Sequence, residues 1–114
     1  GQTLPPQTQS FLEALCRRDP LLLMEALVPL EKWKRDALSQ LLDSWLLITE
    51  AALVSRSGLE AVSPAARMLA AAYTSPELHK ILAALQKCSL YLQSNVSPGA
   101  VCGYLEWHLQ IPKK

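Results

Sequence analysis

The stretch from Glu31 to Ser57 (EKWKRDALSQLLDSWLLITEAALVSRS) constrains this chain most, because only a helix gathers its apolar residues onto one face. At 3.6 residues per turn that face holds Leu38, Leu41, Leu42, Trp45, Leu46, Ile48, Ala52 and Leu53. Acidic and amide side chains fall opposite, and Gly58 follows where a helix end favours a positive φ. At about 1.5 Å per residue we expect a helix of roughly 40 Å, long enough for other helices to pack around.

Proline follows a capping residue at four positions, and each pair predicts the start of a helix. The pairs are Asp19-Pro20, Ser63-Pro64, Ser75-Pro76 and Ser97-Pro98. Thr8 or Ser10 is expected to cap a further, first helix through FLEALCRR, and Pro29 to end or kink the second one. No segment alternates with period two. The sequence therefore predicts an all-α single domain of five to six helices packed around Glu31–Ser57.

At 114 residues the chain has the length of one domain. We expect residues 1–10 to be a linker or tag remnant, 11–111 a helical domain excised from a longer protein, and 112–114 a tail. Charged residues make up 18% of the chain, against about 25% in typical domains, and the net charge is only +1. The three cysteines form no CxxC pair, no signal peptide is visible, and polar residues interrupt the uncharged run 88–105. These features favour a cytoplasmic protein without a membrane span.

Two helices carry apolar residues on a second face. Leu47 and Val54 lie on the polar side of the long helix, where either a neighbouring helix or a partner protein would have to cover them. The last helix, 98–110, has one apolar face of Val101, Cys102, Leu105 and Leu109, and a second of Ala100, Gly103, Tyr104, Trp107 and Ile111. Either the first helix folds back over this second face, or it is an interface that Tyr104 and Trp107 anchor.

The sequence offers no catalytic constellation. His79 and His108 lie on different helices, Cys88 and Cys102 on apolar stripes, and no nucleotide-binding or hydrolase motif occurs. We therefore expect no enzyme activity, cofactor, metal or small-molecule substrate. An alternative function is nucleic-acid binding through the basic residues Arg17, Arg18, Lys32, Lys34 and Arg35.

Two segments, LLDSWLLITEAAL in the long helix and LQSNVSPGAVCGYLEWHL at the end, resemble the C-terminal domain of the delta-prime subunit of bacterial DNA polymerase III clamp loaders. Asn95 and Pro98 match the Asn and Pro that precede the last helix in that family. The sequence departs from the family at Ile48-Thr49-Glu50, where many relatives carry an Arg-Asp pair, and at Ser97, where they carry Asn. The matching domain of the tau/gamma subunit is an alternative.

The resemblance implies a collar domain, that is, a helical domain that joins four others in a ring holding the clamp loader together. The implied partners are the delta and tau/gamma subunits. Contact between this region and DNA is not expected from the resemblance, because separate N-terminal domains handle nucleotide, clamp and DNA in that family.

Overall fold

The computed structural model describes residues 4–58 and 63–110, and every stretch of regular structure in them is helical. The elements are α1 Pro6–Arg17, α2 Pro20–Leu27, the 3-10 helix η1 Val28–Lys32, α3 Arg35–Arg56, α4 Pro64–Ala72, α5 Ser75–Gln93 and α6 Pro98–His108. The predicted all-α class is confirmed.

Three of the four predicted helix starts are confirmed by their side-chain caps. The carboxylate of Asp19 accepts hydrogen bonds from the N–H groups of Leu21 and Leu22 at the start of α2. The hydroxyls of Ser63 and Ser97 each accept one from the N–H three residues later, at the starts of α4 and α6. These contacts satisfy N–H groups that the first helical turn leaves without partners.

The fourth predicted cap, Ser75, is wrong by one residue. Thr74 caps α5: its hydroxyl accepts from the Glu77 N–H, and the Glu77 carboxylate accepts from the Thr74 N–H at 2.8 Å. This reciprocal pair is a capping box, which needs Thr and Glu three residues apart. Ser75 is instead the first residue of the helix.

The first helix begins earlier than expected. Pro6 occupies its first position, where proline's fixed φ suits a helix, so residues 6–10 belong to α1 and not to a linker. Neither Thr8 nor Ser10 is its cap. Thr8 is buried, with 1% of its surface exposed, and its hydroxyl accepts a hydrogen bond of 2.9 Å from the indole N–H of Trp45.

The long helix is shorter than expected, since α3 starts at Arg35 and not at Glu31. Pro29 promotes the tighter η1 turn, and the backbone is extended at Trp33 and Lys34. Arg35 then ties the start of α3 to the end of α5, because its guanidinium donates to the carbonyls of Leu92 at 2.7 Å and Val96 at 2.6 Å. At the other end Gly58 has the expected positive φ of 97°.

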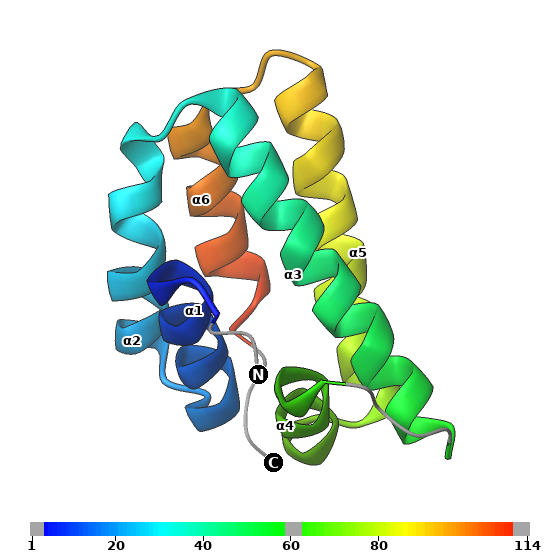
Figure 1. Cartoon of the computed structure of the whole chain (residues 1–114). Helices are drawn as coiled ribbons and strands as arrows, with labels where there is room; N and C mark the ends of the chain where they lie inside the picture. Colours follow the sequence, from blue (N-terminus) through cyan, green and yellow to red (C-terminus); the bar gives the residue numbers. More distant parts are fainter. Residues whose placement is uncertain (1–3, 59–62, 111–114) are drawn as a thin grey trace.

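The helices form two neighbouring groups (Figure 1). Helices α3 and α5 run antiparallel side by side, with α4 packed against α3 near its C-terminal end. On the other side α1 and α2 form a hairpin, and α6 packs between α2 with η1 and α5. Because α6 contacts chiefly these elements, not every helix packs around α3 as we expected.

Trp45 joins the two groups in the core. Its ring, 1% exposed, stacks on Phe11 of α1 with 3.7 Å between ring centroids and an angle of 3° between the planes. All the apolar-face residues predicted for α3 are buried or partly buried in this core. Each large side chain buried this way contributes about 1.5–3 kcal/mol relative to exposure.

Replacing Thr8 by Val should lower the free energy of unfolding by about 1–3 kcal/mol, because the shape is kept while the buried Trp45 N–H loses its acceptor. Urea unfolding followed by tryptophan fluorescence measures the change. Thr8→Ser keeps the hydroxyl and should lose about 1 kcal/mol or less. Equal stability of Thr8→Val and wild type would show that this hydrogen bond does not hold α1 in place.

Candidate functional site

The exposed apolar side chains mark the candidate functional site. The large ones are Leu21, Met24, Val28, Leu47, Val54, Met68, Leu90 and Trp107. Scattered exposed apolar residues are normal, but here they concentrate on two sides of the domain.

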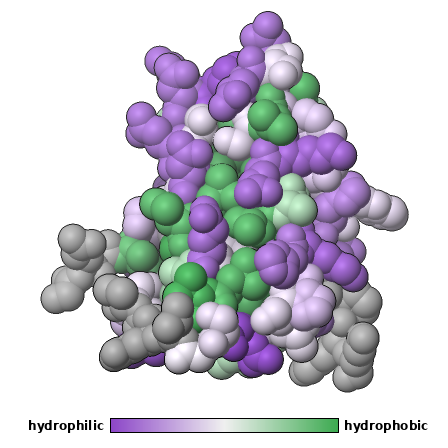
Figure 2. Space-filling view, turned by 90° about the vertical axis from the view of Figure 1, so that its right-hand side faces the viewer, coloured by the Kyte–Doolittle hydropathy of each residue, from purple (hydrophilic) through white to green (hydrophobic). Residues whose placement is uncertain are grey.

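The first side lies over α3 and α5. Leu47 is 67% exposed and Val54 44%, so no neighbouring helix of the described domain covers them, and that alternative is wrong. Leu90 of α5 is 61% exposed. Figure 2 looks onto this side and shows apolar surface running down its middle between polar side chains. We call Leu47, Val54 and Leu90 the α3/α5 surface.

The second side includes the last helix. Trp107 is 77% exposed, so α1 does not fold over it, and the alternative covering is again wrong. Tyr104 behaves differently: it is partly buried, edge-on to Tyr91 of α5 at 5.4 Å and stacked on His108 at 3.9 Å. The structure therefore leaves Trp107 as the exposed aromatic residue of α6 and fixes Tyr104 against α5. Ile111, the remaining predicted contact, lies outside the described residues.

Helix α2 adds to this side a stripe that sequence reasoning missed. Leu21 (59% exposed), Met24 (47%) and Val28 (47%), the last being the C-cap of α2 and the first residue of η1, are spaced by three and four residues and so share one face. Because α2 packs against α6, the exposed faces of the two helices adjoin. We call Leu21, Met24, Val28 and Trp107 the α2/α6 surface. The spacing was visible in LLLMEALV, but apolar residues occur on all faces of that helix. Only its packing against other helices decides which face is exposed.

The five basic residues predicted for nucleic-acid binding do not form one free patch. Arg17 pairs with Glu13 on the surface at 3.1 Å, and Arg35 is held by the two carbonyls described above. Arg18 is committed to contacts within the domain. Only Lys32 and Lys34 of the five are exposed with no described contact that holds them.

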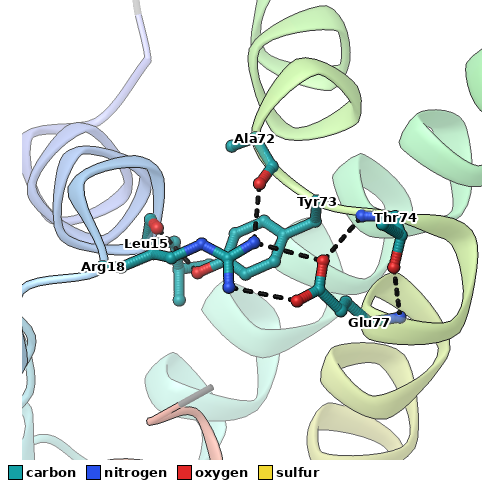
Figure 3. Close-up of polar contacts among 6 residues, drawn as sticks. All are labelled: Leu15, Arg18, Ala72, Tyr73, Thr74 and Glu77. Carbon is teal, nitrogen blue, oxygen red and sulfur yellow. Dashed lines mark hydrogen bonds and ion pairs between the residues drawn. The ribbon is translucent and has the colours of Figure 1, made fainter. Parts of the chain in front are cut away.

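Arg18 is the centre of a polar network that clamps α1 to the α4–α5 turn (Figure 3). Its guanidinium bonds both carboxylate oxygens of Glu77 at 3.1 Å, donates to the carbonyl of Ala72 at 2.8 Å, and lies 4.2 Å from the centre of the Tyr73 ring. The Tyr73 hydroxyl donates to the carbonyl of Leu15 at 2.6 Å. This bidentate pair serves the fold, and Arg18 is not placed to contact a phosphate.

The network shifts two pKa values. The hydrogen bonds from Arg18, followed by that from the Thr74 N–H, lower the pKa of Glu77 to about 2. Burial raises the pKa of Tyr73 to about 12 against the opposing charge of Arg18. At neutral pH the clamp therefore consists of a carboxylate, a guanidinium and a neutral phenol.

The described residues give little support to catalysis. Burial raises the pKa of the Cys88 and Cys102 thiols to about 12, which disfavours the nucleophilic thiolate. Among residues 4–58 and 63–110 no group of His, Cys, Asp or Glu is arranged to hold a metal ion. A mostly apolar cleft of about 400 Å³ lies between α1 and α4, where burial also raises the pKa of the Cys16 thiol.

By length and composition α3 alone, of the described helices, could cross a membrane. The core helix of a globular domain passes the same test, and α3 carries the buried Trp45.

Comparison with known proteins gives no significant match to a family model, a curated protein or a solved structure. The features of this chain that bear on its function are therefore its exposed surfaces and the two sequence segments quoted above.

The Glu77→Gln variant tests the Arg18–Glu77 clamp through the pH dependence of the free energy of unfolding. The Glu77 pKa is lower in the folded than in the unfolded chain, so its ionised form stabilises the fold above about pH 4.5, and this contribution is lost as pH falls toward 2. The variant should be less stable than wild type at pH 7. It should also lose part of the decrease in unfolding free energy that wild type shows between pH 4.5 and 2, measured by urea unfolding.

Glu13→Gln is the matched control, because Glu13 and Arg17 form an exposed pair whose loss should change stability by about 0.5 kcal/mol or less. If Glu77→Gln keeps the full acid dependence of wild type, Arg18 and Glu77 do not form the described clamp in solution.

Proposed function

We propose that this domain is an assembly module, which binds other protein chains through its α2/α6 and α3/α5 surfaces. The observation that carries the proposal is Trp107, a tryptophan 77% exposed in a domain poor in surface charge. Tryptophan is the residue type most enriched among the side chains that dominate binding energy, and burying it in a partner's pocket would contribute on the order of 2 kcal/mol or more.

The finer proposal is that the module is the collar domain of a clamp-loader subunit of the delta-prime type, acting in bacterial DNA replication in the cytoplasm. It is supported by the all-α fold, the long α3, and the segment LQSNVSPGAVCGYLEWHL, which forms the end of α5 and α6. The proposed partners are the collar domains of the delta and tau/gamma subunits. The corresponding tau/gamma domain is the alternative identity within the same assembly.

Nucleic-acid binding is not favoured as a second function. Of the five basic residues, Arg18 and Arg35 form contacts that stabilise the fold, and Arg17 pairs with the acidic residue Glu13. The remaining two lysines do not form a basic face as strongly charged as nucleic-acid-binding proteins usually have.

Trp107→Ala should weaken assembly and leave the fold intact. We expect the full-length protein to form a complex with the delta and tau/gamma subunits of the same organism, and the variant to bind at least about tenfold more weakly. Analytical ultracentrifugation measures the complex. The free energy of unfolding should change by about 0.5 kcal/mol or less, because the side chain is exposed.

Met68→Ala is a matched control, since Met68 is 51% exposed on α4 but belongs to neither surface. It should leave assembly unchanged. A complex that forms equally well with Trp107→Ala would contradict the proposed role of Trp107, and the absence of any complex would contradict the clamp-loader assignment.

A further inference from the structure

The α2/α6 surface carries acidic groups and lacks arginine. Glu31 of η1 and Glu106 of α6 lie beside it, whereas Glu25 of α2 lines a cleft toward α1 with Ser10 and Glu13. Lys32 is the one lysine on α2, η1 and α6. The Glu31 carboxylate lies over the first turn of α6, with Oε1 4.0 Å from the position that a Cβ would take at Gly99. An apolar stripe and two neighbouring carboxylates therefore occur together on one side of the domain.

Among the described residues, the carboxylate of Glu106 lacks a hydrogen-bond donor at one of its oxygens. Its Oε1 is buried and has no hydrogen-bond partner within the part of the chain that the structure describes. Burial, followed by the nearby charge of Glu31, raises the pKa of Glu106. A buried carboxylate oxygen without a donor is costly, and a cation between Glu31 and Glu106 would stabilise both groups.

Gly103 supplies a second observation. It lies on α6 three residues before Glu106 and four before Trp107, so it occupies the strip between them. A Cβ built at Gly103 meets nothing within 4 Å, and its φ is not in the left-handed region. A helix is less stable with glycine at an interior position than with alanine there. Nothing in the fold requires glycine here, whereas a partner backbone approaching α6 closely would.

We propose that the α2/α6 surface docks a helix of another protein that carries both an apolar stripe and an arginine or lysine. The stripe packs over Gly103 against Trp107 and the exposed side chains of α2, and the cation reaches Glu31 and Glu106. This inference rests on the proposed assembly function, of which it names the partner's chemistry. A second copy of this chain fits less well, because its own α2/α6 surface would bring further glutamates against these.

The first test uses a synthetic helical peptide with leucines at positions i, i+3, i+4 and i+7 and arginines beside them, labelled with fluorescein. A second peptide carries glutamates in place of the arginines. Fluorescence anisotropy should show that the arginine peptide binds the full chain at least tenfold more tightly than the glutamate peptide. The Gly103→Leu and Glu106→Gln variants should each bind the arginine peptide at least tenfold more weakly than wild type.

Gly103→Leu should fold normally, because the space beside Gly103 is open, and circular dichroism checks this. Met68→Ala, which belongs to neither surface, is the matched control and should bind the peptide like wild type. Equal binding of the two peptides, or full binding by both Gly103→Leu and Glu106→Gln, would overturn the inference.

The same variants separate this inference from the proposed function. If the clamp-loader complex forms and Gly103→Leu joins it fully, the inference fails and the proposed function stands. If the peptide results are as expected and no complex forms with the clamp-loader subunits, the docking surface stands and the clamp-loader assignment fails.

Discussion

Trp45 packs between the long helix α3 and the N-terminal helix α1 and so joins the two groups of helices in the core. Its indole ring stacks on Phe11 and its N–H is satisfied by Thr8, so one side chain of α3 holds α1 in place. The hairpin of α1 and α2 then supplies one wall for α6, and α5 supplies the other. Loss of the Trp45 contacts would weaken the link between α1 and α3, whereas the Arg18–Glu77 clamp and the packing of α6 on α5 would still join the two groups of helices.

Two arginines complete this arrangement at opposite ends of the fold. Arg18 clamps α1 to the turn before α5. Arg35 clamps the start of α3 to the carbonyls of Leu92 at the end of α5 and Val96 in the segment after it. Both satisfy backbone carbonyls that helix ends leave without partners. The fold uses these two charges internally, so they are not available to a partner. The exposed apolar side chains are the most distinctive feature of the outer surface.

The helical class, three caps and the buried face of α3 could be predicted from the sequence, because each depends on residues a few positions apart. The burial of Thr8 could not, since its hydroxyl accepts from Trp45, which lies 37 residues away. The start of α1 at Pro6 follows the same local proline rule as the other helices. The roles of Arg18 and Arg35 depend on carbonyls more than 50 residues away in the chain. The Thr74 cap was predictable, because Glu77 follows it at the capping-box spacing. For the candidate site, Leu47, Val54 and Trp107 were correctly identified as apolar residues on outward faces, whereas the exposed side of α2 followed only from its packing against α1 and α6.

We infer that Trp107 becomes buried when this domain assembles with partner chains, whereas Trp45 stays in the core throughout. Fluorine NMR of the full-length protein labelled with 5-fluorotryptophan tests it directly, with resonances assigned by single Trp→Phe variants. In the free protein the Trp107 resonance should respond to exchange of H2O for D2O and the Trp45 resonance should not. On addition of the delta and tau/gamma subunits the Trp107 resonance should shift and lose this response. A Trp107 resonance that keeps its full solvent response in the assembled complex would show that Trp107 is not buried on assembly.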